Sequence, residues 1–163
     1  MIKAEQLSYE SFEPFGSFVN PLDCGDPLGG EGGSVLAYSD RILQQFTTSN
    51  YIAYTPLVIR PRRFKITVTE IHKNTEEVFG GFNCDMCFHV APPGEGDVIP
   101  PVSEFKVFHL PAGWWVRLKR GVWHHGPFVI GTDISVGMAV LPPYTYTNDS
   151  IVVTLEEPIE IDI

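Results

Sequence analysis

The sequence predicts an all-β fold in which many short strands build a jelly roll or a barrel. Fourteen prolines and fifteen glycines are spread along the chain and separate short runs rich in Val, Ile, Phe and Thr, as is typical of short strands joined by turns. So many strands require that sheet edges be closed or covered, which a double-sheet jelly roll or a closed barrel achieves. We expect a single domain over residues 1–163, because 44% hydrophobic and 12% aromatic residues suffice for one core.

Local composition predicts the elements in chain order. Two segments favour short helices outside the barrel: residues 8–15, which begin with a serine suited to cap a helix, and residues 40–47, where the periodicity is weak. The expected strands are rich in aromatic and β-branched residues and cover 52–59, 64–72, 77–82, 85–91, 103–109, 114–118, 122–123, 128–130, 134–140 and 151–155. Residues 21–33 and 91–101 are rich in glycine and proline, and we expect loops there.

Charge and cysteine content narrow the class of function. A net charge of −9 opposes binding to nucleic acid and to anionic membranes. The apolar runs are too short to span a bilayer, and the N-terminal segment lacks the apolar stretch of a signal peptide. Three cysteines disfavour a disulfide framework and agree with a reducing compartment. We therefore expect a cytoplasmic protein that binds a small-molecule substrate and neither nucleic acid nor membrane.

Residues 113–125, GWWVRLKRGVWHH, predict a strand, a tight turn and a second strand that presents an imidazole. Gly121 can adopt the positive φ that such a turn requires, so we expect His124 to be held rigidly just after the turn. His125 follows directly, and successive side chains of a strand face opposite ways. We therefore expect one of the two histidines to face the interior.

A second polar group lies in residues 66–79, ITVTEIHKNTEEVF. Glu70 and His72 are two residues apart, so they share one face of the strand that carries them. Charged residues at alternate positions also occur on ordinary exposed strands, but the apolar residues here do not alternate cleanly, which favours a site. Glu76 and Glu77 are adjacent, so only one of them can point inward.

Together these two segments resemble the two signature motifs of the cupin superfamily. The first motif is matched by Glu70-x-His72 with Glu76 or Glu77, and the second by Gly113, Gly121 and His124, with Lys119 where proline is usual. Within the superfamily the chain is most similar to the ureidoglycolate lyase family, formerly called ureidoglycolate hydrolases, at Glu70, His72, Phe79, Val122, Trp123, His124 and His125. The resemblance implies a cupin double-stranded β-helix with one or two short peripheral helices and, by analogy with the fold, a homodimer.

The resemblance to the lyase family also implies a reaction, the elimination of urea from ureidoglycolate to give glyoxylate. The expected catalytic residues are His72, Glu77 and His124, with His124 or Glu77 as the base and His72 as the acid or as a metal ligand. Superfamily spacing favours Glu76 as the inward glutamate, while alignment on Phe79 favours Glu77, which we prefer. The same spacing makes His124 the inward histidine and implies that His125 lies behind the site or at the surface. Arg117 or Lys119 is expected to hold the substrate carboxylate, and Trp123 to form a cavity wall.

A divalent metal is compatible with this set of side chains. Glu70, His72, Glu76 and His124 are the candidate ligands for Zn, Mn, Ni or Fe, and paired acid and base catalysis without a metal stays open. Glu77 stands where the family pattern has glutamine and adds negative charge near an anionic substrate. Two alternatives therefore remain: a metal-dependent cupin enzyme acting on another small hydroxy acid or sugar derivative, and a non-enzymatic cupin that binds a small ligand.

Two further features have simpler interpretations. Cys84 and Cys87 form a C-x-x-C pattern, but an offset of three places the sulfurs on opposite faces of a strand, and no second pair completes a zinc site. We expect buried strand cysteines. His89 could face the cavity, although an interior histidine with satisfied hydrogen bonds is the more common case.

Overall fold

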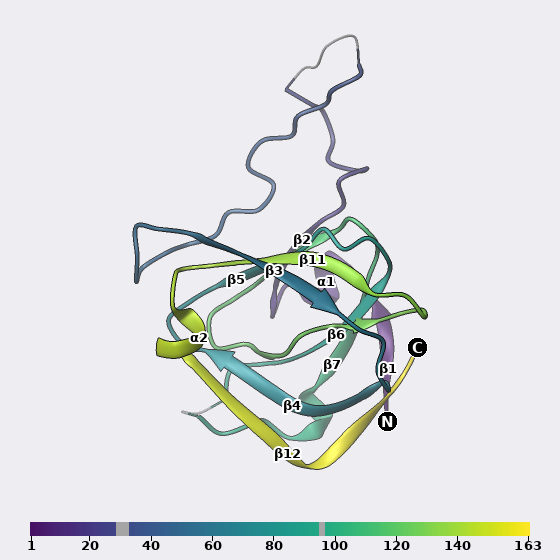
Figure 1. Cartoon of the computed structure of the whole chain (residues 1–163), viewed down its shortest axis with the longest axis vertical. Helices are drawn as coiled ribbons and strands as arrows, with labels where there is room; N and C mark the ends of the chain where they lie inside the picture. Colours follow the sequence, from purple (N-terminus) through teal and green to yellow (C-terminus); the bar gives the residue numbers. More distant parts are fainter. Residues whose placement is uncertain (29–32, 95–96) are drawn as a thin grey trace.

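The computed structural model describes residues 1–28, 33–94 and 97–163 and confirms an all-β jelly roll (Figure 1). Short helices are α1 (Tyr9–Phe12), the 3-10 turn η1 (Val102–Glu104) and α2 (Thr145–Asn148). The strands are β1 (Ile2–Gln6), β2 (Gly16–Val19), β3 (Ala53–Ile59), β4 (Lys65–His72), β5 (Glu77–Gly80), β6 (Met86–Ala91), β7 (Lys106–Leu110), β8 (Trp115–Leu118), β9 (Trp123–His124), β10 (Phe128–Val129), β11 (Ser135–Leu141) and β12 (Ser150–Asp162).

These strands form two sheets. One has the order β2-β8-β5-β11-β3, and the other has the order β10-β6-β7-β1-β12-β4-β9. An additional pairing joins β6 to β9, so the ladder of the second sheet closes on itself. β1 runs parallel to both β7 and β12, whereas β4 and β12 form a long antiparallel pair. Figure 1 shows β2, β3 and β11 on one side of the molecule and β4, β7 and β12 on the other.

The buried apolar residues form two cores, of which the first joins the two sheets. The first is rich in phenylalanine and includes Phe12 of α1, whose ring meets that of Phe108 edge to face at 5.2 Å between centroids. The second consists of residues of the seven-stranded sheet and its loops, with Trp123 fully buried among them. Cys87 lies buried on β6 in the second core, as predicted, whereas Cys84 is half-buried in the bend before β6 and packs against the first core. Both thiols are free.

Several elements differ from the sequence-based expectation. Residues 40–47 form bends and turns instead of a helix, because the Gln44 amide donates to the carbonyls of Glu76 and Val140 at 2.7 and 2.9 Å and fixes the segment by tertiary contacts. β1, β2 and α2 were not predicted, and β12 continues to Asp162 past an irregularity between Thr154 and Ile159. Residues 29–32 and 95–96 of the two expected loops lie outside the described residues.

The segment around Gly121 is not a hairpin, although its turn forms as expected. β8 pairs with β2 and β5 in one sheet, while β9 pairs with β4 and β6 in the other, so the turn carries the chain from sheet to sheet. Gly121 has a φ of 75°, and its N–H donates to the carbonyl of His72 at 2.8 Å. The turn thereby ties the segment before His124 to the end of β4. Within the described residues, the helices are all too short to cross a membrane.

Candidate active site

A cavity of about 250 Å³ lies between the sheets, smaller than the roughly 300–1,000 Å³ usual for drug-sized ligands. Its wall combines the carboxylates of Glu70 and Glu77 and the imidazoles of His124 and His125 with apolar residues of β3 and β5. The lining residues are Thr55, Leu57, Glu70, Glu77, Phe79, His124, His125, Gly126, Pro127 and Tyr146. The volume suits a small organic acid.

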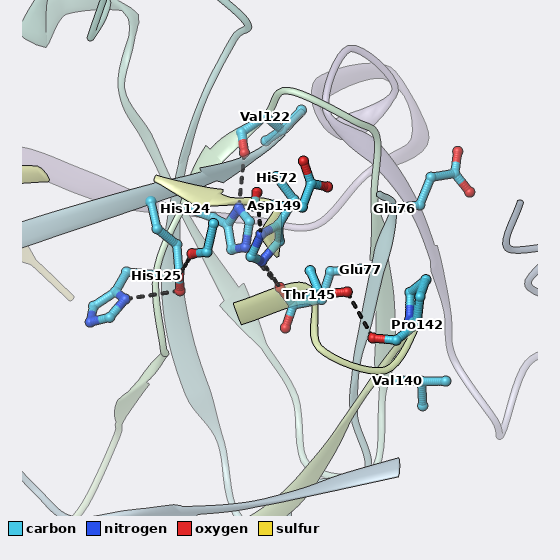
Figure 2. A network of polar contacts seen from close by, with 12 residues as sticks. His72, Glu76, Glu77, Val122, His124, His125, Val140, Pro142, Thr145 and Asp149 are labelled. Atoms are coloured by element: carbon cyan, nitrogen blue, oxygen red, sulfur yellow. Dashed lines mark hydrogen bonds and ion pairs between the residues drawn. The ribbon is translucent and has the colours of Figure 1, made fainter. Parts of the chain in front are cut away.

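Three strands bring the polar side chains together (Figure 2). β4 ends with Glu70 and His72 on one face, β5 begins at Glu77, and β9 ends at His124. Glu70 and His124 are direct partners in the register of β4 and β9. Because two of these strands belong to one sheet and the third to the other, the packing of the sheets positions the carboxylate of Glu77 against the two imidazoles.

Glu77 is the centre of the cluster. Its Oε2 lies 2.8 Å from Nε2 of His124 and 3.2 Å from Nε2 of His72. Burial alone would raise the pKa of Glu77, but the hydrogen bonds and charges of His124 and His72 outweigh it and lower the pKa to about 2. Glu77, which is 6% exposed, is therefore an ionised buried carboxylate.

His124 faces oxygen acceptors at both ring nitrogens. Its Nδ1 lies 2.8 Å from the carbonyl oxygen of Val122, while Nε2 faces Glu77. Both contacts are hydrogen bonds only if both nitrogens carry a proton. Burial lowers the pKa of His124, but the bond to Glu77 and the negative charges of Glu77 and Glu70 raise it above its ordinary value. His124 and Glu77 thus form an imidazolium–carboxylate pair.

His72 lies buried behind Glu77 and His124, and Tyr146, which lines the cavity, packs against it. Nδ1 of His72 lies 3.4 Å from the carbonyl oxygen of Asp149, and its ring meets the His124 ring at 5.2 Å between centroids. The Tyr146 ring packs edge-on against His72 at 5.9 Å. Burial, together with the charges of Glu77 and Glu70, raises the pKa of Tyr146. Its phenol is therefore a neutral donor at the cavity wall.

Glu70 has partners at both carboxylate oxygens. Oε1 lies 3.1 Å from Nδ1 of His125, and Oε2 accepts from the Ser150 hydroxyl at 2.9 Å. Burial raises the pKa of Glu70, but the bond to His125 and the nearby His124 shift the balance, so the net change is downward. Glu70 is a second ionised carboxylate in the same cavity.

The donor set fits a divalent metal ion. One ligand atom from each of Glu70, His72 and His124 lies within 4.8 Å of the others. The Nδ1 atoms of both histidines point at backbone carbonyls, which is the outer support that metal-bound histidines usually have and which directs Nε2 inward. Carboxylate and imidazole donors of this kind suit Zn, Mn, Ni or Fe.

Four residues that the sequence placed near the site lie elsewhere. The carboxylate of Glu76 points away from the imidazoles in Figure 2 and accepts from the backbone N–H of Gln45 at 2.8 Å and from Nη1 of Arg117 at 3.2 Å. Glu76 is therefore not among the clustered metal donors. Lys119 pairs with Glu13, and Trp123 is buried in the second core.

Arg117 and Lys119 are not among the residues that line the cavity, because Arg117 is held by Ser17 and Glu76 and Lys119 by Glu13. Trp123 precedes His124 on β9 and so takes the opposite face. His125 lines the cavity beside His124, because β9 ends at His124 and strand alternation stops there. Tyr146 was not identified from the sequence, since α2 carries no motif.

Comparisons with known proteins agree with one another. The sequence model of the family described as "Ureidoglycolate lyase" matches residues 1–162. A curated ureidoglycolate lyase from Schizosaccharomyces pombe is 26% identical over 188 aligned residues, which cover 99% of this chain and 95% of the relative. The match therefore extends over both sheets and every strand that supplies the cavity.

Proposed function

The chain belongs to the ureidoglycolate lyase family, and on that premise we propose that it releases urea from ureidoglycolate and leaves glyoxylate. The observation that carries this proposal is the buried Glu77 carboxylate between His72 and His124, in a cavity of about 250 Å³. The reaction needs one base and one acid, because the carbinol O–H loses a proton and the departing ureido nitrogen gains one. An ionised carboxylate beside an imidazolium offers both.

We assign the base to Glu77 and the acid to His124. Glu77 takes the hydroxyl proton while the C–N bond breaks and the C=O bond of glyoxylate forms. His124 gives its Nε2 proton to the ureido nitrogen, which leaves as urea. A proton then passes from Glu77 to His124 along their 2.8 Å contact, and the resting state is restored.

The remaining residues of the cavity orient these two groups. The Val122 carbonyl holds the His124 ring at Nδ1, and Nε2 of His72 contacts the same Glu77 oxygen, Oε2, as His124 does. The neutral phenol of Tyr146 is a hydrogen-bond donor for a substrate oxygen. Phe79 and Leu57 exclude water from the apolar part of the wall. Exclusion of water strengthens each electrostatic contact inside the cavity.

As an alternative to catalysis by the imidazolium, we propose a divalent metal as the cofactor of this site, with Glu70, His72 and His124 as its ligands. Metal binding would require Nε2 of His124 to be deprotonated, so the ion would replace the imidazolium acid. When bound, such an ion polarises the substrate hydroxyl and offsets the negative charge that the two glutamates present to an anionic substrate. Among the described residues, none of those lining the cavity is Arg or Lys, which supports this assignment.

We expect the protein to be cytoplasmic and to form a homodimer. The three thiols, Cys24, Cys84 and Cys87, are free, which agrees with a reducing compartment. β3 is the edge strand of its sheet, and Tyr54, Val58 and Val136 are exposed on its outer side and that of β11. An apolar sheet edge of this kind is a suitable surface for pairing with a second copy.

The test is release of urea and glyoxylate from racemic ureidoglycolate by the purified protein. The assay is run on the protein as isolated, after chelation, and after adding back Mn, Ni or Zn. Turnover that is abolished in His124→Ala supports the lyase assignment, and loss on chelation with recovery on metal addition supports the metal. Folded protein with no turnover under any of these conditions contradicts the assignment.

A further inference from the structure

A second cavity of about 330 Å³ adjoins the reaction cavity. It lies between the end of β3, the outer part of β4 and the segment that follows β9. Its lining residues are Ile59, Arg62, Lys65, Thr67, Val68, His89, His125, Gly126 and Phe128. His125 and Gly126 also line the reaction cavity. The two cavities therefore share one wall.

The two cavities differ in charge. The reaction cavity is lined by the carboxylates of Glu70 and Glu77, and the second cavity by the cations Arg62 and Lys65. Of the residues that the structure describes, none of those lining the second cavity is acidic. In a protein of net charge −9, this is a local concentration of positive charge directly beside the site of reaction.

Arg62 is fixed in place at this wall. Its Nη1 donates to the Pro127 carbonyl at 2.7 Å and its Nη2 to the Gly126 carbonyl at 2.6 Å. The guanidinium also lies over the Phe128 ring, 3.9 Å from the centroid. An arginine carries five N–H donors, so these two contacts orient the group and leave donors for a carboxylate. Lys65 pairs with Glu160 at 3.2 Å, but both groups are exposed and such a pair is weak.

His89 adds no charge to this cavity. The Thr69 hydroxyl donates to the His124 carbonyl at 3.2 Å, so its oxygen accepts from Nε2 of His89 at 3.1 Å. Burial, reinforced by neighbouring positive charges, lowers the pKa of His89 well below its ordinary value. The ring is therefore neutral, and the positive potential of the cavity comes from Arg62 and Lys65.

We infer that the second cavity is an anion subsite, which binds the carboxylate of a small hydroxy acid or oxo acid next to the reaction cavity. Arg62 and Lys65 hold the carboxylate, and Thr67 contributes a hydroxyl at the wall. Two glutamates repel an anion that approaches the reaction cavity directly, whereas a cationic neighbour raises its local concentration. The role of the subsite in turnover rests on the proposed function, but carboxylate binding does not.

Glycolate binding tests the subsite without turnover. Calorimetric titration compares the wild type with Arg62→Gln, Lys65→Gln and the matched control Arg63→Gln, which removes the same charge outside the cavity lining. We expect Arg62→Gln to weaken binding by about tenfold or more, as for the loss of one charge-assisted hydrogen bond, and Lys65→Gln by about threefold. Arg63→Gln should stay within twofold, and NMR shifts on titration should centre on the amides of Thr67 and Phe128.

Arg62 also holds residues 126 and 127 in place, so Arg62→Gln can weaken binding by disturbing the local structure. Lys65→Gln and Arg62→Lys separate a loss of binding from such a local effect. Arg62→Lys keeps the charge and should retain more affinity than Arg62→Gln. Equal weakening in Arg63→Gln, or unchanged affinity in both Arg62→Gln and Lys65→Gln, overturns the subsite. Glycolate binding that depends on Arg62 in a protein that releases no urea supports the subsite and contradicts the proposed function. In an active protein, we expect Lys65→Gln to raise KM and leave kcat within twofold.

Discussion

Oε2 of Glu77 lies 2.8 Å from Nε2 of His124, and both side chains are buried at the meeting point of the two sheets. The pair joins a residue that begins β5 to a residue that ends β9. This proximity depends on the packing of one sheet against the other. Substitutions at Glu77 or His124 therefore test the proposed chemistry of the cavity.

The pH dependence of turnover follows from this pair. His124 must be protonated to act as the acid, and Glu77 raises its pKa above 6.5, so kcat should fall as pH rises through that raised value. In Glu77→Gln the carboxylate is lost while burial still lowers the pKa of His124, which should therefore titrate at lower pH. NMR titration of the His124 ring checks both statements. An unchanged His124 pKa in Glu77→Gln would contradict the pairing.

Metal binding should depend on His72. Calorimetric titration of chelator-treated protein with Mn, Ni or Zn should give one site per chain in the wild type and at least a tenfold loss of affinity in His72→Ala, because one of the three ligands is gone. His109→Ala is the control, since His109 pairs with Asp85 at 3.0 Å, away from the cavity. Equal affinity in His72→Ala and the wild type would place the metal elsewhere.

Stability should fall below pH 6.5 in part because of His89. Burial keeps its folded pKa well below 6.5, so at low pH the unfolded chain binds a proton that the folded chain does not. Each pH unit below 6.5 then lowers the free energy of unfolding by up to about 1.4 kcal/mol. His89→Gln should remove this contribution. Denaturant unfolding between pH 4 and 8 measures the free energy of unfolding of the wild type and of His89→Gln. Identical slopes of this free energy against pH in the two proteins would refute the contribution of His89.

Arg117 should matter for stability and not for turnover. Its Nη1 lies 3.2 Å from Glu76, whose side chain is 10% exposed, so Arg117→Gln leaves a nearly buried carboxylate without its cationic partner and with the Gln45 N–H as its remaining donor. We expect a loss of about 2 kcal/mol in the free energy of unfolding and a kcat within twofold of the wild type. A large rise in KM with unchanged stability would instead support the substrate-binding role that the sequence suggested.

The position of Glu70 and His72 on one face of β4 could be predicted from the sequence, because the alternation of side chains along a strand is a local property. The positive φ at Gly121 was predictable for the same reason, since glycine is favoured there by its own backbone. Neither feature depends on which strands pair with each other. The all-β class followed equally from local composition.

The partners of β8 and β9 could not be predicted, because the same local signals describe a hairpin and a crossover between sheets. The sequence therefore could not show that Arg117 and Lys119 contact Glu76 and Glu13 and do not line the cavity. Tyr146 was missed because its position depends on α2, a single turn between β11 and β12 whose sequence has no distinguishing pattern. These features depend on contacts between segments far apart in the chain.

The most direct test of the account compares kcat for urea release in Glu77→Gln and Glu76→Gln. The two variants make the same chemical change at adjacent residues, but only Glu77 contacts His72 and His124. We predict a loss of about 10²- to 10⁴-fold in kcat for Glu77→Gln, as for removal of a general base, and a change within threefold for Glu76→Gln. Full activity in Glu77→Gln, or an equal loss in both variants, would contradict the assignment of Glu77 as the base.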